Sequence, residues 1–274
     1  MTNARFVWRM LTAVLLGPTL AGCVATTQTL PPTLPTADLK DRTTASDESD
    51  GQKRAQARMD LASAYFGRGQ TRTALDEVKL AIAADPNYGQ AFNLRGLIYA
   101  NLGDNARAEE SFKRALQINP SDADALHNYA YFLCEQKRYG ESTTLFNQTL
   151  AVPQYRGAAR TLLALGVCQA FAGQLAQSDV SLARSYELDP ANPATATNLA
   201  QVLYQRGEFE RARFYIRRVN AMPNVSNAQT LWLAARIEHK MGDESGTAEF
   251  GRELRNRFPD SREASAYARG AFDE

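Results

Sequence analysis

Residues 89–122 have the sequence GQAFNLRGLIYANLGDNARAEESFKRALQINPSD, and this stretch decides the fold. Gly103 can take the left-handed backbone conformation that ends one helix and reverses the chain. Pro120 restricts the residue before it and cannot continue a helix, so a second helix must stop there. Small residues at Gly96 and Ala108 let two antiparallel helices approach closely. The stretch therefore predicts a helix-turn-helix unit whose remaining space is filled by large apolar side chains.

The same marks recur along the chain with a period near 34 residues. The turn glycines are Gly69, Gly103, Gly173, Gly207 and Gly242, and the stop prolines are Pro86, Pro120, Pro190 and Pro259. Small residues in both helices step by 34, 34, 36, 34 and 35. This pattern resembles the tetratricopeptide repeat. The resemblance implies an all-α superhelix of about six repeats, near 55–88, 89–122, 123–158, 159–192, 193–227 and 228–261.

Lys137 and Glu238 are two of the positions that depart from the repeat pattern. Lys137 stands where the third unit needs its turn glycine, and Glu238 stands where the sixth unit usually has an aromatic residue or leucine. After Pro259 the chain offers a short final helix, with Asp260 as its expected N-cap and Glu263 at its third position. A solenoid must cover its last apolar face, so we expect this segment to cap the array.

Composition excludes several classes of function. The chain has 274 residues with 31 Lys and Arg against 30 Asp and Glu, and 44% of its residues are hydrophobic. This is the composition of a folded globular protein, and it lacks the basic surplus on which nucleic-acid binding depends. We therefore expect no nucleic-acid partner.

The first 23 residues predict an export signal and a lipid anchor. Arg5 and Arg9 precede an apolar run at residues 10–17 that is too short to span a bilayer. The run is followed by a box that resembles the bacterial lipobox, in which cleavage leaves an acylated cysteine at the new N-terminus. That box consists of Leu20, Ala21, Gly22 and Cys23.

The expected organisation follows from that box. Residues 1–22 form the lipoprotein signal peptide, and the only covalent group expected is the lipid on Cys23. Val24 is not the aspartate that retains lipoproteins in the inner membrane, so by resemblance to sorting rules we expect an outer-membrane location facing the periplasm. Residues 23–51 are rich in Thr, Pro and polar residues and predict a flexible tether. Residues 52–274 form the repeat domain.

No residues form a catalytic or metal-binding constellation. His127 and His239 lie in the first helices of different units, without another ligand at metal-binding spacing, and are interpreted as ordinary surface or groove histidines. The cluster at Arg211, Arg213, Arg217 and Arg218 is interpreted as a solvated outer face. We expect a protein that is not an enzyme and has no cofactor, metal or small-molecule substrate.

Two cysteines remain besides the lipidated one. Cys134 and Cys168 lie in the first helices of neighbouring units, and the periplasm is oxidising, which favours a disulfide. Against this, adjacent helix axes lie ~8–10 Å apart, whereas a disulfide needs Cα atoms within ~7 Å. Two extra residues between these units would permit closer approach. The alternative is a pair of buried free thiols.

The partner surface is expected on the concave side, at positions 2, 5, 9 and 12 of each first helix. This rule yields an apolar and aromatic lining suited to an amphipathic helix or an extended apolar segment. The alternative is that several of these side chains pack between repeats and leave a shallower, more polar groove. The predicted groove residues are Met59, Phe66, Leu97, Tyr131, Leu163, Val167, Tyr204 and Trp232.

Two stretches carry a more specific resemblance. Residues 125–134, ALHNYAYFLC, and residues 254–261, LRNRFPDS, are similar to the type IV pilus biogenesis/stability lipoprotein family (PilW/PilF). The resemblance implies a pilotin, an outer-membrane lipoprotein that helps the pilus secretin reach the membrane and form its multimeric ring. The competing interpretation is a general periplasmic scaffold that recruits envelope-assembly or peptidoglycan enzymes.

Overall fold

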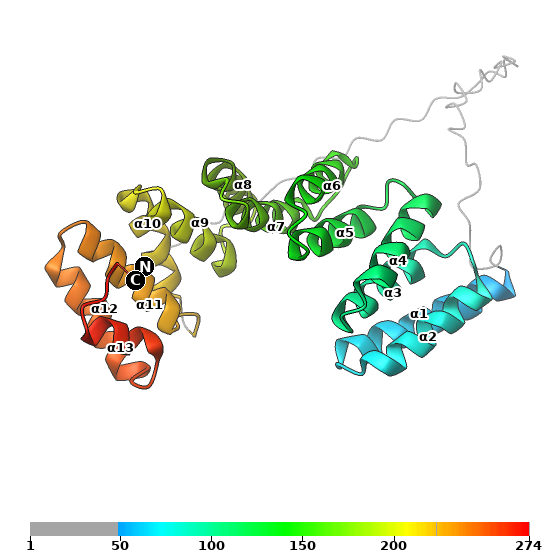
Figure 1. Ribbon diagram of the computed structural model, residues 1–274, viewed down its shortest axis with the longest axis horizontal. Coiled ribbons are helices and arrows are strands. Elements are labelled where there is room, and N and C mark those ends of the chain that lie inside the picture. Colours follow the sequence, from blue (N-terminus) through cyan, green and yellow to red (C-terminus); the bar gives the residue numbers. More distant parts are fainter. Residues whose placement is uncertain (1–48, 223, 274) are drawn as a thin grey trace, which may run out of the picture. The chain divides into compact units, whose positions relative to one another are not determined.

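The computed structural model describes residues 49–222 and 224–273, and in this part of the chain every regular element is a helix (Figure 1). Twelve helices form six antiparallel pairs, and a thirteenth follows them. The pairs are α1 (Asp50–Gly67) and α2 (Thr71–Ala84), α3 (Gly89–Asn101) and α4 (Asn105–Ile118), α5 (Ala123–Glu135) and α6 (Tyr139–Ala151), α7 (Ala158–Phe171) and α8 (Leu175–Leu188), α9 (Pro193–Gln205) and α10 (Phe209–Asn220), and α11 (Ala228–Lys240) and α12 (Glu244–Arg257), followed by α13 (Arg262–Ala268).

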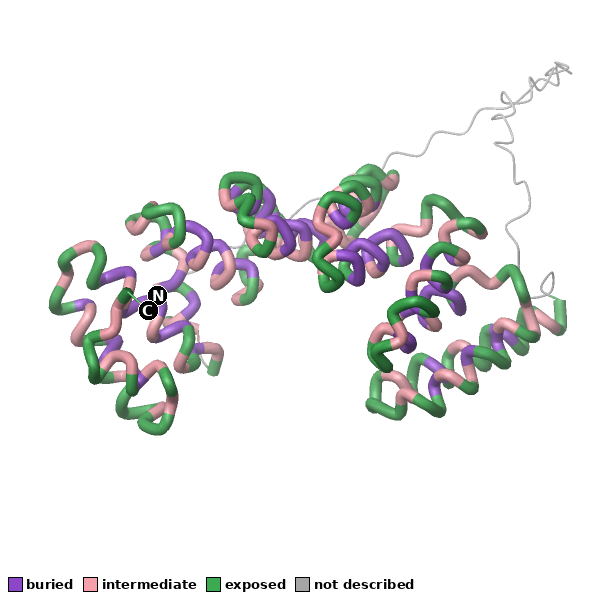
Figure 2. The backbone as a smooth tube through the Cα atoms, viewed as in Figure 1, coloured by how far each residue is buried: buried purple, intermediate pink, exposed green. Residues whose placement is uncertain are grey.

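The pairs stack in chain order to form a tetratricopeptide-repeat superhelix. Each first helix contacts the first helix of the next pair, while each second helix contacts the following first helix but not the following second helix. First helices therefore form a continuous layer, and second helices cover its other side. Figure 2 shows buried residues concentrated where helices meet and exposed residues at the turns and on the outer surfaces of helices.

The turns within the pairs have the backbone that the repeat pattern requires. The five turn glycines all have φ between 73° and 78°. Lys137 takes the same place in the third unit with φ 61°, a conformation that costs a residue with a Cβ roughly 1–2 kcal/mol. The turn is thus kept by tertiary packing even where its preferred residue is missing.

The ends of the array differ in two details from the sequence-based expectation. The first helix begins at Asp50, so the expected tether at 23–51 overlaps it by two residues. Ser49 accepts a hydrogen bond from the Gln52 backbone, and the Gln52 side chain accepts one from the Ser49 N–H, at 3.2 Å and 2.8 Å. This capping box starts the helix inside a polar run. At the other end the N-cap of α13 is Ser261, not Asp260.

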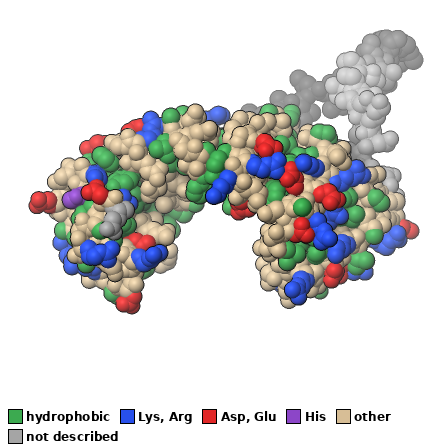
Figure 3. Space-filling model, in the orientation of Figure 1, with side chains coloured by type: hydrophobic (Ala, Val, Ile, Leu, Met, Phe, Trp, Pro, Cys, Tyr) green, Lys and Arg blue, Asp and Glu red, His purple; other side chains and the backbone are tan. Residues whose placement is uncertain are grey.

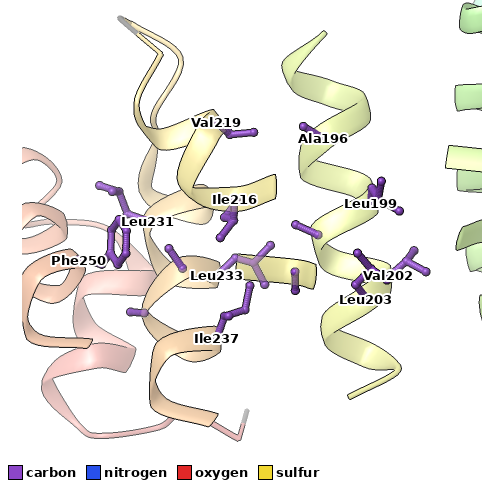
Figure 4. Close-up of a cluster of buried hydrophobic side chains, with 14 of the residues drawn as sticks. Ala196, Leu199, Val202, Leu203, Ile216, Val219, Leu231, Leu233, Ile237 and Phe250 are labelled. Atoms are coloured by element: carbon purple, nitrogen blue, oxygen red, sulfur yellow. The ribbon is translucent and has the colours of Figure 1, made fainter. Parts of the chain in front are cut away.

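Buried apolar side chains form clusters between successive repeats. The largest runs from α8 to α13, and Figure 4 shows side chains of α9, α10, α11 and α12 that point into it. The cluster between the third and fourth units contains Ala130, Phe146, Leu165 and Cys168. The cap is held closely, because a Cβ at Gly251 would overlap the ring of Tyr267. These clusters fix the first helices and so position the surface described next.

Candidate partner-binding face

The predicted groove residues all lie on first helices, and the structure buries none of them completely. Tyr131 is 49% exposed, and the other seven are of intermediate exposure. Several of them also pack against the core: Leu163, Tyr204 and Trp232 lie against the large C-terminal cluster, and Leu97 lies against a cluster of α3, α4 and α5. The two interpretations of this face are therefore both partly correct.

One hollow of about 490 Å³ lies on this face in the N-terminal half of the array. Met59, Leu94 and Leu97 supply its apolar lining, and polar side chains of α3, α5 with its N-cap, and α7 supply the rest. Asn128 donates a hydrogen bond from Nδ2 to Oδ1 of Asn93 at 3.1 Å. This hollow thus offers a small apolar patch bordered by amide groups.

A second hollow of about 580 Å³ lies among α9, α11 and α13. It is lined by Trp232 and Arg236 of α11, by polar side chains at the corresponding positions of α9, and by Glu263 of the cap. The Arg236 guanidinium lies 4.8 Å from the centroid of the Tyr204 ring and 6.0 Å from that of Trp232. Its positive charge is therefore held by aromatic rings at the floor of the groove.

The lining of these hollows lies between the two expectations, an apolar groove and a more polar one. Both are lined by residues at positions 2, 5 and 9 of the first helices, as the repeat numbering predicts, but amide, hydroxyl and charged groups outnumber apolar ones. The predicted groove residues that line neither hollow are Phe66, Tyr131, Leu163, Val167 and Tyr204. A partner segment must therefore carry polar groups as well as one or two apolar anchors.

Cys134 of α5 and Cys168 of α7 form a disulfide, with their Cα atoms 5.9 Å apart. Cys168 is completely buried, and its sulfur lies 3.4 Å from Oγ of Ser142. The two first helices approach within bonding distance at this junction, where the expected third unit, 123–158, is two residues longer than the units on either side. The bond ties the third repeat to the fourth.

The interpretation of His127 as a surface or groove histidine is wrong. Its side chain is only 7% exposed, its Nδ1 lies 2.9 Å from Oγ1 of Thr161, and its ring meets the Phe146 ring edge-on. Burial, helped by the nearby positive charge of Arg160, lowers the pKa of His127 to about 4. His127 is therefore a neutral core residue. One sequence signal pointed to this burial: His127 stands beside Leu126 in a strongly apolar helix.

The arginine cluster on α10 is also not simply a solvated face. Arg217 donates from Nε to Glu238 at 2.6 Å, and Arg213 donates to the same carboxylate at 3.1 Å. Glu238 of α11 is fully buried, so the two guanidinium groups neutralise it. Arg211 is exposed but pairs with Asp179 of α8 at 2.9 Å, and Arg218 lies on the surface over the Phe214 ring. The sequence signal for the pairing with Arg213 and Arg217 was Glu238 itself, because a carboxylate at a position that is usually apolar needs a partner when buried.

Acidic and basic side chains are interspersed over the face seen in Figure 3, so this face carries no extended field of one sign. Among residues 49–222 and 224–273, no three His, Cys, Asp or Glu side chains come together in a way that could hold a metal ion. The first-helix face, with its two hollows, offers apolar anchors and hydrogen-bonding groups, which suit a polypeptide partner.

Known proteins place this fold in a family. Tetratricopeptide-repeat families match residues 59–123 and 101–166. The type IV pilus assembly protein PilF of Pseudomonas aeruginosa is 28% identical over 207 residues, which is 76% of this chain and 82% of PilF. PilW, whose crystal structure is described as that of a widely conserved type IV pilus biogenesis factor, has 30% sequence identity to this chain. The two structures superpose with a TM-score of 0.72 over 78% of this chain and 98% of PilW.

The chain belongs to the PilW/PilF family. The structure of Pseudomonas aeruginosa PilF agrees, with 26% identity and a TM-score of 0.72 over 81% of this chain and all of that one. As a PilW/PilF protein, the chain is a tetratricopeptide-repeat protein of type IV pilus biogenesis, a protein-binding scaffold and not an enzyme. The expectation from residues 125–134 and 254–261 is confirmed at this level.

The predicted lipid anchor falls on residues that lie outside the described part of the chain. The box Leu20, Ala21, Gly22 and Cys23 falls outside residues 49–222 and 224–273. Within those residues, no helix has both the length and the apolar character needed to cross a membrane. A family of pilus biogenesis proteins is consistent with a place in the cell envelope, and anchoring by lipid stays a prediction.

Proposed function

We propose that the protein is a pilotin: an outer-membrane lipoprotein that binds the type IV pilus secretin and promotes its localisation and its assembly into a multimeric ring. The observation that carries this proposal is the continuous first-helix face in a chain of the PilW/PilF family, with hollows at the positions where tetratricopeptide repeats present side chains. The mixed lining of the two hollows offers a peptide segment both apolar anchors and hydrogen-bonding groups.

The membrane part of the proposal rests on Cys23. Acyl chains on this cysteine would hold the protein to the bilayer, because each buried CH₂ contributes ~0.8 kcal/mol and several chains act together. Cys23→Ser should abolish acylation and leave the precursor uncleaved, while the repeat domain still folds. Metabolic labelling with palmitate tests this, and label retained by the Cys23→Ser protein would refute the anchor.

The partner part is tested by capture of the secretin from solubilised envelopes by the full chain. Tyr131→Ala and Trp232→Ala should each weaken capture by ~1–3 kcal/mol if the side chain is a buried anchor, which is roughly 5- to 150-fold. Tyr131→Ala is the cleaner variant, because half of this side chain is exposed and little core packing is lost.

Arg218→Ala is the matched control, since Arg218 is exposed on α10 and forms no part of the first-helix face. Circular dichroism should show the same helix content in all three variants. If the control loses secretin and the two aromatic variants keep it, the secretin binds the opposite face, which the second helices form. If the full chain captures an envelope enzyme and no secretin, the protein is a general scaffold.

A further inference from the structure

The chain does not end at its capping helix. After α13, Gly270 takes a left-handed conformation with φ 68°, and the Ala271 N–H donates to the Ala266 carbonyl at 3.0 Å. This turn closes the helix and sends residues 271–273 back over α11, which is the first helix of the sixth repeat. The tail is thus laid on a helix that lies more than thirty residues earlier in the chain.

Phe272 is the centre of this contact. Its ring stacks on the His239 ring, with centroids 4.0 Å apart and planes 16° apart, and on Trp232, at 5.3 Å and 29°. Tyr267 of the cap meets the same ring edge-on at 5.9 Å. One aromatic side chain therefore fills a slot whose walls are three other rings.

Polar contacts fix the tail around that ring. Arg236 donates from Nε to the carbonyl oxygen of Phe272 at 3.0 Å. Lys240 pairs with the carboxylate of Asp273, one residue further along. This pair lowers the pKa of Asp273 and raises that of Lys240, so both groups carry their charge across the neutral range. The slot thus combines an aromatic site with a cationic site directly next to it.

The residues that hold the tail are groove residues. Trp232, Arg236 and His239 occupy positions 5, 9 and 12 of the sixth first helix, the positions at which this repeat presents side chains to a partner. Trp232 and Arg236 also line the hollow among α9, α11 and α13. The tail therefore occupies one end of the face that the proposed function assigns to the partner.

We propose that residues 271–273 are a built-in ligand of the sixth repeat, and that the partner segment bound there carries the same chemistry: an aromatic side chain followed directly by a carboxylate. The proposal rests on the proposed function, because it names the partner chemistry of the same face. Tethering gives the tail a high effective concentration, so a free segment must displace it. Until then the tail shields the aromatic slot from water.

The test supplies the tail in trans. The probe is a fluorescein-labelled peptide that copies residues 269–274, and the proteins are the full chain and a chain that ends at Gly270. Polarisation should show the peptide binding at least tenfold more tightly to the shortened chain, because its slot is vacant. A peptide with alanine in place of Phe272, or asparagine in place of Asp273, should bind at least fivefold more weakly. Equal binding to both chains, or equal binding of the three peptides, overturns the proposal.

Phe272→Ala in the full chain decides the matter if the shortened chain does not fold. An occupied slot predicts that this variant takes up the peptide at least fivefold more tightly than the unmodified chain. Phe171→Ala is its control, since Phe171 is 70% exposed at the end of α7 and belongs to another repeat. If Phe272→Ala lowers the melting temperature without any gain in peptide binding, the tail is only a structural cap and the proposal is wrong.

These outcomes are separate from those of the proposed function. Capture of the secretin by the full chain tests the pilotin role and needs no peptide. Failure of the peptide experiment with capture intact removes only the tail proposal, whereas loss of capture with peptide binding intact removes the secretin as partner.

Discussion

Acidification should destabilise this protein through one buried histidine. His127 lies in the core between α5 and α7, held by the hydroxyl of Thr161 and the ring of Phe146. Its pKa is about 4 in the folded protein because burial disfavours the charged ring, whereas an exposed histidine has a pKa near 6.5. Asp124 partly opposes this shift and Arg160 reinforces it, and these two are themselves paired at 2.7 Å.

The sign and size follow from proton linkage. Between pH 6.5 and 4 the unfolded chain binds a proton at His127 that the folded chain does not, so the free energy of unfolding falls as the pH falls. The loss approaches ~1.4 kcal/mol per pH unit within this window and sums to about 2.5 kcal/mol between pH 7.5 and 4.5. Above pH 7 the ring of His127 is neutral in both states, so it adds nothing to the pH dependence of the free energy of unfolding.

Carboxylates act in a different window. The hydrogen bond from Arg138 lowers the pKa of Glu109 to about 2, so the stability that this carboxylate contributes is complete above its unfolded pKa and is lost only as the pH falls from about 4.5 toward 2. Glu109 therefore contributes little to the change between pH 7.5 and 5, and comparison with the His127→Gln variant separates the histidine from the carboxylate at lower pH.

The assay is urea unfolding of the full chain, followed by circular dichroism at half-unit steps of pH. His127→Gln keeps a hydrogen-bonding group toward Thr161 but cannot take up a proton, so its unfolding free energy should lack the 2.5 kcal/mol decline. His239→Gln is the matched control, because it makes the same substitution at the other histidine and leaves His127 in its buried place. The reasoning is refuted if His127→Gln follows the unmodified protein through pH 6.5–4.5.

Three further predictions concern stability. Replacing the two bridged cysteines with serine should lower the free energy of unfolding by ~3–4 kcal/mol, since the bond closes a 34-residue separation, and an unchanged urea midpoint would contradict this. Lys137→Gly should raise it by about 0.5–1 kcal/mol by relieving a left-handed backbone, and a fall in melting temperature would show that the strain is absent. Arg213→Ala combined with Arg217→Ala should lower the free energy of unfolding by about 3 kcal/mol in urea titrations, because buried Glu238 loses both counter-ions. Adding Glu238→Leu to these two changes should recover most of that loss, and no recovery would disprove the pairing argument.

Much of the fold could be predicted from the sequence because each repeat marks its own ends. Expected units starting at residues 89, 123, 193 and 228 coincide with the starts of α3, α5, α9 and α11, and α7 begins one residue before the expected 159. The start of α1 could not be placed this way, because a capping box inside a polar run has the same composition as a tether. Local hydrogen bonds, not composition, decided that boundary.

The site was predictable only as a set of positions. Repeat numbering selects the residues that line the two hollows, since every unit presents the same positions. It does not say which neighbours will cover them. The tail over α11 joins Phe272 to Arg236 across 36 residues, and the ion pairs of Glu238 reach back 21 and 25 residues. Such contacts depend on how the units pack, which a single helix pattern does not contain.

The disulfide between Cys134 and Cys168 also determines how far a local opening can spread. In a linear array each repeat is stabilised by its neighbours alone, so melting stops or continues at each junction according to the strength of that junction. The apolar cluster between the third and fourth repeats is small, with Ala130, Phe146, Leu165 and Cys168 as its buried members. A covalent bond across this junction couples the two halves of the array, so we expect them to respond to heat or denaturant together. We expect reduction to weaken this coupling, so that an opening in one half of the array spreads less readily into the other.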